Sequence, residues 1–116
     1  MSLTASRCVI LISESDRTFA QLLKEHISEY GELLEYVYLG DIAFEINSRM
    51  DWDSAILNRL MKAVESCLEC QDLRPVIAAG LFESLGRDSL TSGGALWRFL
   101  GTRGRDLAVE MFPSGR

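Results

Sequence analysis

Cys67 and Cys70 form a C-x-x-C pair, the arrangement in this 116-residue chain with the most familiar chemistry. Such a pair can bind a metal ion or undergo thiol–disulfide exchange. A tetrahedral metal site needs two further ligands, and the other cysteine and histidine residues, Cys8 and His26, are distant in sequence. Redox activity favours a helix N-terminus, whereas this pair falls near the predicted end of a helix. We therefore interpret the cysteines as structural and expect no metal site and no cofactor.

His26 is the only histidine, and it lies between Glu25 and Glu29 on a predicted helix. A catalytic histidine needs a serine or cysteine nucleophile within reach, and the sequence ties none to His26. We therefore predict that His26 lies on the surface.

Glu83 is the charged residue of the most apolar segment, which runs from residue 76 to residue 85. Carboxylates are rarely buried without a partner. The sequence therefore predicts a structural ion pair between Glu83 and an arginine, with Arg98 and Arg105 as the candidates. A catalytic role would need a second acid in the same cleft, for which Asp41 is the candidate. An enzyme using this carboxylate pair is the least favoured function.

The three tyrosines lie within nine residues and are interleaved with carboxylates. Tyrosine combines a large apolar ring with a polar hydroxyl group, which suits a surface that contacts another protein. Carboxylates beside it would select a cationic partner. The residues of this predicted partner-binding surface are Glu32, Glu35, Tyr36, Tyr38 and Asp41. The alternative interpretation is a solvated helical face that binds nothing.

The same segment also carries apolar residues that need burial, namely Leu33, Leu34, Val37 and Leu39. Part of it must therefore belong to the core. The tyrosines would then close the edge of that core, and Asp41 would cap a following helix. Glu32, Glu35 and Tyr36 are the members that we expect to face outward.

Charge is unevenly distributed along the chain, whose net charge is −5. Residues 25–53 contain eight acids and a single base, Arg49, whereas residues 87–105 contain four arginines and a single acid, Asp88. We therefore expect a protein partner with a basic surface. Nucleic acid is disfavoured, because phosphate contacts need cations. The opposite charges of the two segments make a homodimer a second hypothesis, and its association would weaken as salt screens the charges.

Helical periodicity predicts the elements that position these residues. The clearest helix runs from Ser54 to about Cys70, with a cap at Asp53 or Ser54 and one apolar stripe. Residues 7–12 are either a short strand or the start of a helix, because so few apolar residues cannot settle the period. A second predicted helix begins after Ser13 or Ser15 and ends at Gly31. Further helices are predicted at residues 41–50, 72–85, 95–100 and 105–111. Residues 31–40 fit either a helix or a strand, and we favour helix.

These elements predict an all-α fold: a compact bundle of about five to six helices in one domain, residues 1–116, with a short N-terminal strand as an option. Residues 1–6 and 113–116 are expected to be loose termini. The longest apolar run, Cys8–Ile12, is far shorter than the roughly 20 residues that cross a bilayer. We expect a soluble, cytoplasmic protein without a membrane segment.

Four short blocks carry a resemblance to a known family. They are Gly31-Glu-Leu-Leu34, Tyr38-Leu-Gly-Asp41, Ala79-Gly-Leu-Phe-Glu-Ser-Leu85 and Leu100-Gly101. In this order they resemble a family of short bacterial all-helical proteins filed as a domain of unknown function. Thr102 stands where that pattern has proline. The resemblance implies an all-helical fold and no particular activity.

The sequence thus predicts a small soluble interaction module that binds a protein partner through an acidic, tyrosine-bearing surface. An immunity-type inhibitor of a basic toxin is one such module, by analogy with other small acidic proteins. The alternatives are a self-associating structural subunit and the enzyme described above.

Overall fold

The computed structural model describes residues 4–49 and 51–113, and it contains helices and loops but no strand within those ranges. Its α-helices are α1 (Ala5–Ser13), α2 (Arg17–Tyr30), α3 (Glu35–Asn47), α4 (Ser54–Leu68), α5 (Arg74–Ile77), α6 (Glu83–Leu85), α7 (Arg87–Leu90) and α8 (Thr102–Met111). Short 3₁₀ turns occupy Gln71–Leu73 and Trp97–Phe99. A π-helical turn, Ala78–Phe82, joins α5 and α6 into one continuous helix.

The prediction of a compact all-α fold is confirmed, with a radius of gyration of 13.4 Å. Counting α5, the π-turn and α6 as one helix gives seven helices in the described ranges, slightly more than the five to six expected. Compared with the predicted helices, α1 and α7 are additional, whereas the helix predicted at residues 95–100 is wrong, because only the 3₁₀ turn Trp97–Phe99 forms there. The predicted end of α3 at Met50 lies outside the described residues.

The segment that was ambiguous between strand and helix forms α1. Thr4 caps this helix, because its side chain accepts a hydrogen bond from the Arg7 N–H. Cys8, Val9 and Ile12 are fully buried, and their spacing follows the helical period. Of the two alternatives left open for residues 7–12, the helix is therefore correct and the optional N-terminal strand is wrong. Residues 1–3 and 114–116 of the expected loose termini lie outside the described residues.

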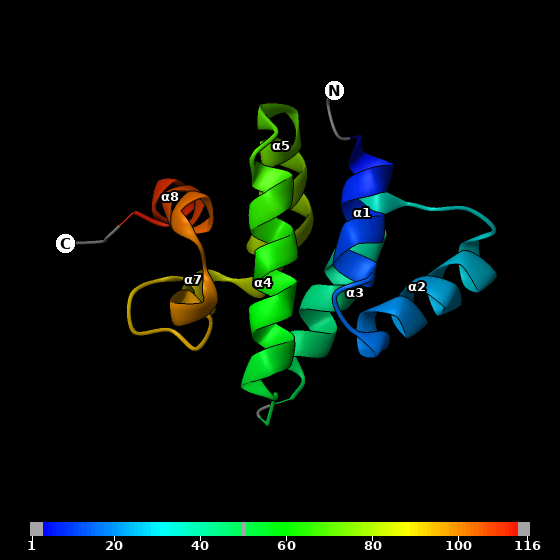
Figure 1. The fold of residues 1–116 in the computed structure, drawn as a ribbon, viewed down its shortest axis with the longest axis horizontal. Coiled ribbons are helices and arrows are strands. Elements are labelled where there is room, and N and C mark those ends of the chain that lie inside the picture. The colour runs from blue at the N-terminus through cyan, green and yellow to red at the C-terminus, as the bar shows by residue number, and fades with distance from the viewer. Residues whose placement is uncertain (1–3, 50, 114–116) are drawn as a thin grey trace.

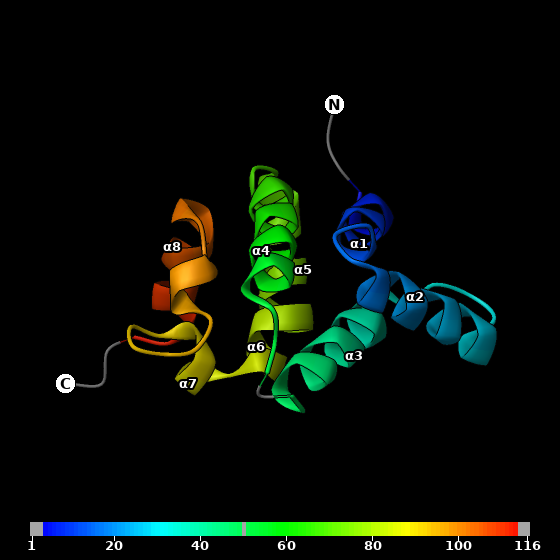
Figure 2. The same ribbon diagram turned by 60° about the horizontal axis from the view of Figure 1, so that its bottom comes forward.

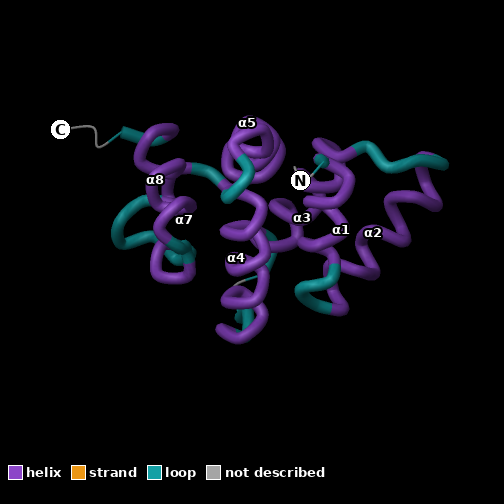
Figure 3. The backbone as a smooth tube through the Cα atoms, turned by 45° about the horizontal axis from the view of Figure 1, so that its top comes forward, coloured by secondary structure: helices purple, strands orange, loops and turns teal. Residues whose placement is uncertain are grey.

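Helix α4 runs through the centre of the molecule, with α1, α2 and α3 on one side and α7 and α8 on the other (Figures 1 and 2). Its start matches the sequence prediction, because the Asp53 side chain accepts a hydrogen bond from the Ala55 N–H at 2.8 Å. Its buried stripe contains Leu57, Leu60, Met61, Val64, Cys67 and Leu68. The same arrangement of helices around α4 is visible in the backbone trace of Figure 3.

Helix α2 lies at the edge of the molecule, at the right of Figures 1 to 3. Only Phe19 and His26 are buried along its length. It ends at Gly31, whose φ of 76° is the left-handed conformation that glycine adopts without strain. The loop that follows returns the chain to α3, which packs against α2.

The continuous helix from α5 to α6 presents one exposed stripe, formed by Pro75, Ala79 and Glu83. The most apolar segment of the sequence is therefore not buried on every side. The π-turn of this helix packs against α3. A Cβ atom on Gly80 would lie 2.7 Å from Leu39 Cδ1, so glycine permits this close approach.

Helix α8 is attached to α4 by a side-chain cap. The Glu65 carboxylate accepts hydrogen bonds from the N–H groups of Arg103 and Gly104, at 2.9 and 3.0 Å. These are N–H groups of the first helical turn that have no partner within the helix. Among the described residues, no helix has the length and apolar character needed to cross a membrane.

Candidate functional site

The structure separates the five residues of the predicted partner-binding surface. Glu32 is exposed in the loop between α2 and α3. Glu35 lies in the first turn of α3, where its carboxylate accepts a hydrogen bond from the Ser6 hydroxyl at 3.0 Å. Tyr36 is half exposed, and the Asp41 side chain is 47% exposed. Asp41 lies inside α3 and therefore does not cap a following helix.

Tyr38 does not lie on this surface, because its side chain is fully buried. Its hydroxyl group donates a hydrogen bond of 2.7 Å to the carbonyl oxygen of Phe19. Burial, and secondarily the Asp41 carboxylate, raises the pKa of Tyr38, so the hydroxyl group stays protonated as a donor. Including Tyr38 in the binding surface was wrong, since this residue joins α3 to α2 in the core.

His26 is also buried, contrary to the prediction of a surface histidine. Its Nε2 atom accepts a hydrogen bond of 2.9 Å from the N–H of Leu34, so the neutral ring carries its proton on Nδ1. Nδ1 lies 3.7 Å from the Asp41 carboxylate and makes no hydrogen bond with any described residue. With Nε2 occupied by the backbone, His26 holds the loop before α3 and is not available as a general base.

The exposed face of α3 carries apolar residues that sequence reasoning did not assign to a site. Phe44 is 75% exposed, and Val37, which was expected to be buried, is 39% exposed. Residues seven apart lie on the same side of a helix, so Val37 and Phe44 form one stripe. Gly40 lies between them, and a Cβ atom there would meet no atom within 4 Å. Gly40 therefore has open space where a side chain would stand.

Two of the predicted residues flank this stripe, one on each side. Tyr36 lies on the side of α3 that faces the π-turn, where its ring approaches Gly80. Asp41 lies on the other side, towards His26 in α2. We refer to Tyr36, Val37, Gly40, Asp41 and Phe44 together as the α3 face. The sequence contained a sign that Phe44 is exposed, because Phe44 does not lie on the same side of the helix as Ile42 and Ile46.

The carboxylates near the α3 face are largely uncompensated. Glu25, Glu29, Glu32 and Glu35 form no ion pair within the described part of the chain. Glu45 is the exception, because Arg49 donates two hydrogen bonds to its carboxylate at 2.8 and 3.1 Å. The surface around α3 and the adjacent end of α2 therefore carries net negative charge, which attracts cationic groups.

The predicted ion pair of Glu83 does not form, and Glu83 is exposed. The guanidinium of Arg98 lies over the Phe99 ring and contacts the Ser54 hydroxyl. The guanidinium of Arg105 lies over the Trp97 ring and donates to the Trp97 carbonyl. The prediction failed because Glu83 lies on the exposed stripe of its helix, so its carboxylate has access to water and needs no partner.

The second candidate pair, Asp41 and Glu83, is not supported by the fold. Leu39 is the residue of α3 that faces the π-turn before α6. Asp41 follows two positions later, which is about 200° around the helix, and it points towards α2 instead. Neither of two pockets on the molecule contains Asp41 or Glu83 in its lining.

Cys8 and Cys67 are free thiols. Cys8 and Cys67 are fully buried and face each other across α1 and α4, and Cys70 is half-buried. A hydrogen bond with Cys67, followed by burial, raises the pKa of the Cys8 thiol and keeps it protonated. This placement agrees with a structural role. No group of three or more histidine, cysteine or acidic side chains within the described ranges is arranged to hold a metal ion.

Comparisons of the chain with protein-family models, with curated proteins and with solved structures found no match. The candidate function therefore depends on the chemistry of the residues themselves.

Proposed function

We propose that the protein is an interaction module that binds a protein partner through the α3 face. The observation that carries this proposal is the 75% exposure of Phe44 on a helix whose opposite side forms the core. Large aromatic side chains at exposed positions provide the anchors of protein interfaces, where they fill apolar pockets of the partner. The fold buries other large apolar residues of α3 but leaves Phe44 in water.

The spacing of the exposed residues supports a helix that docks in a groove. Tyr36 or Val37 provides one contact and Phe44 another, about two helical turns away. Gly40 leaves room between them for a side chain of the partner. The expected partner therefore offers an apolar groove about two helical turns long.

Charge defines the rim of that groove. Asp41 belongs to the α3 face, Glu29 lies in α2 and Glu32 in the loop before α3, and none of these carboxylates has an ion pair with a described arginine or lysine. A partner with lysine or arginine at the rim would associate faster at low salt, because long-range attraction steers the encounter. An immunity-type inhibitor of a basic toxin fits this description and is the specific form that we propose to test first.

The test uses the product of the neighbouring gene as the candidate partner. We expect the two proteins to copurify, and we expect Phe44→Ala to weaken the affinity measured by calorimetry by roughly 10-fold or more. Val109→Ala is the matched control, because Val109 is an exposed apolar residue on α8, away from α3. Equal affinities for the wild type and Phe44→Ala would overturn the α3 face as the binding site.

The same experiment separates the inhibitor from a self-associating subunit. A homodimer built on α3 would appear as a mass of two chains in analytical ultracentrifugation, and Phe44→Ala would convert it to a monomer. An inhibitor would instead suppress the activity of the copurified protein, and Phe44→Ala would relieve that suppression. An interaction that is equally tight at low and high salt would contradict the electrostatic part of the proposal.

A further inference from the structure

A pocket of about 440 Å³ opens between the end of α3, the start of α4 and the loop that follows α7. Its volume lies within the roughly 300–1,000 Å³ that is typical of small-molecule sites. None of the residues of the α3 face lines it. The pocket is therefore a separate feature, and the inference drawn from it does not depend on the proposed protein interface.

The pocket is lined by both apolar and polar side chains. Ile46, Leu57 and Leu96 are buried residues of the core that reach its inner surface. The partly buried rings of Trp52 and Phe99 line it as well. Two aromatic side chains beside aliphatic ones favour a ligand with a flat apolar body.

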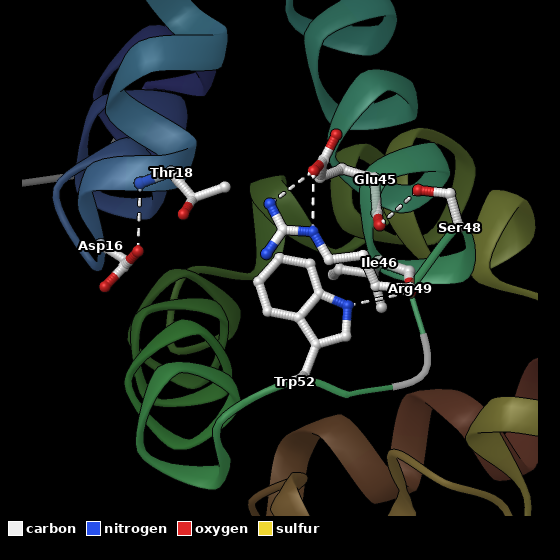
Figure 4. Close-up of polar contacts among 7 residues, drawn as sticks. All are labelled: Asp16, Thr18, Glu45, Ile46, Ser48, Arg49 and Trp52. Carbon is white, nitrogen blue, oxygen red and sulfur yellow. Dashed lines mark hydrogen bonds and ion pairs between the residues drawn. The ribbon is translucent and has the colours of Figure 1, made fainter.

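Two arginines line the pocket, but only one is available to a ligand. Arg49 is held in place, because its guanidinium donates to the Glu45 carboxylate and lies 4.4 Å from the centre of the Trp52 ring (Figure 4). The Trp52 indole N–H donates in turn to the Ile46 carbonyl at 3.0 Å. This chain of contacts fixes the Trp52 side of the pocket and neutralises Arg49.

Arg98 remains without a carboxylate partner among the described residues. Its guanidinium lies 4.7 Å from the centre of the Phe99 ring and contacts the Ser54 hydroxyl at 3.4 Å. Both of these neighbours also line the pocket. A guanidinium and a hydroxyl group side by side can together bind one carboxylate, with charge-assisted hydrogen bonds.

The loop that closes the pocket is folded tightly onto α7. The Leu96 N–H donates to the Ser89 carbonyl at 3.0 Å. A Cβ atom on Gly94 would lie 2.2 Å from the Asp88 carbonyl oxygen, so the loop backbone approaches α7 as closely as glycine allows. These contacts hold Leu96 and Ala95 in the wall before any ligand arrives, which reduces the entropy cost of binding.

We propose that this pocket binds a small organic acid with one aromatic ring and one carboxylate. The ring would lie against the Trp52 and Phe99 side chains that line the pocket, and the carboxylate would accept hydrogen bonds from Arg98 and from the Ser54 hydroxyl group. A single carboxylate matches the single available guanidinium.

The test measures the fluorescence of Trp52 during titration with 3-phenylpropanoate. The chain contains two tryptophans, so Trp97→Phe leaves Trp52 as the only reporter. We expect saturable quenching by the acid and at least tenfold weaker binding of the neutral amide of the same shape. Calorimetry on the unmodified protein repeats the comparison without the Trp97→Phe substitution. The absence of saturation up to about 10 mM, or equal binding of acid and amide, would overturn the proposal.

Two variants locate the ligand. Arg98→Gln should weaken binding of the acid by about tenfold or more while leaving the amide unchanged, because a hydrogen bond to a charged group is lost. Ala95→Phe places a large side chain at an exposed position of the lining and should abolish binding of both compounds. Arg17→Gln, at an exposed arginine of α2, is the matched control and should bind like the wild type. Undiminished binding by Arg98→Gln or Ala95→Phe would show that the acid binds elsewhere.

Discussion

The hydroxyl group of Tyr38 in α3 donates a hydrogen bond of 2.7 Å to the backbone carbonyl of Phe19 in α2. The two residues are 19 positions apart, and both side chains are fully buried. This contact fixes the edge helix α2 to the body of the molecule at a point where few other residues of α2 are buried.

Replacement of Tyr38 tests this contact. Tyr38→Phe removes the hydroxyl group and keeps the ring, so we expect a loss of about 1 kcal/mol in the free energy of unfolding. Tyr36→Phe is the control, because Tyr36 is half exposed and its hydroxyl group makes no hydrogen bond within the described residues; its effect should stay within about 0.5 kcal/mol. Urea denaturation measures both. Equal effects would mean that the hydrogen bond to Phe19 contributes nothing.

The cap that joins α4 to α8 is tested by Glu65→Gln. Glutamine keeps one oxygen acceptor but loses the second and the negative charge near the helix N-terminus. We expect the free energy of unfolding to fall by about 0.5–2 kcal/mol, the range measured for lost N-caps. Glu69→Gln, at an exposed position just beyond the end of α4, should have little effect. The cap would be of no importance if the two variants had the same stability.

Two helical glycines should respond in opposite ways to the same substitution. Gly40→Ala adds a methyl group in open space and should stabilise the protein by about 0.5–1 kcal/mol, because alanine favours the helix. Gly80→Ala places the same group 2.7 Å from Leu39 Cδ1, a fully buried side chain, and should destabilise by about 1–3 kcal/mol. Thermal or urea unfolding of both variants measures the difference. Stabilisation by Gly80→Ala would show that α3 and the π-turn are packed less closely.

The stability of the protein should depend on the ionisation of Asp16, the cap of α2. Burial opposes the charged form, but hydrogen bonds from the Thr18 N–H (Figure 4) and from Arg59 outweigh it and lower the pKa of Asp16. A carboxyl group with a lowered pKa stabilises the folded state fully above its unfolded pKa of about 3.9, and this stabilisation is lost as pH falls through the lower folded pKa.

The matching variant is Asp16→Asn, which keeps an oxygen acceptor for the cap but cannot ionise. Between about pH 5 and pH 2 we expect the wild type to lose more free energy of unfolding than Asp16→Asn. Glu14→Gln, at an exposed neighbouring acid, should follow the wild type. Parallel pH profiles for the wild type and Asp16→Asn would contradict this assignment.

Much of the secondary structure could be predicted from local signals. The start of α4 was predicted from a capping residue and an apolar stripe, both of which lie within a few residues of each other. Gly31 marked the end of α2 for an equally local reason, its left-handed backbone conformation. Helix α7 was missed because Arg87–Leu90 is short and polar, and it forms where the following loop folds back onto it.

The candidate site was predicted only in part. Tyr36 and Asp41 both belong to the α3 face. Tyr36 was expected to face outward, and it does. Tyr38 differs from Tyr36 by only two positions, which places it about 200° around the helix and into the core. Phe44 was visible in the sequence as a residue outside the apolar stripe of its helix, but nothing local indicated that no other helix would cover it.

The sequence by itself determined that the chain is helical, where its best helices begin and that negative charge gathers around residues 25–53. These properties depend on composition, periodicity and capping, which act over a few residues. Only the tertiary structure decided that His26 is buried by the returning loop, that Glu83 faces water and that Trp52, Phe99 and Arg98 surround one pocket. Those outcomes depend on which helix faces cover each other, and that choice is made by contacts between segments far apart in the chain.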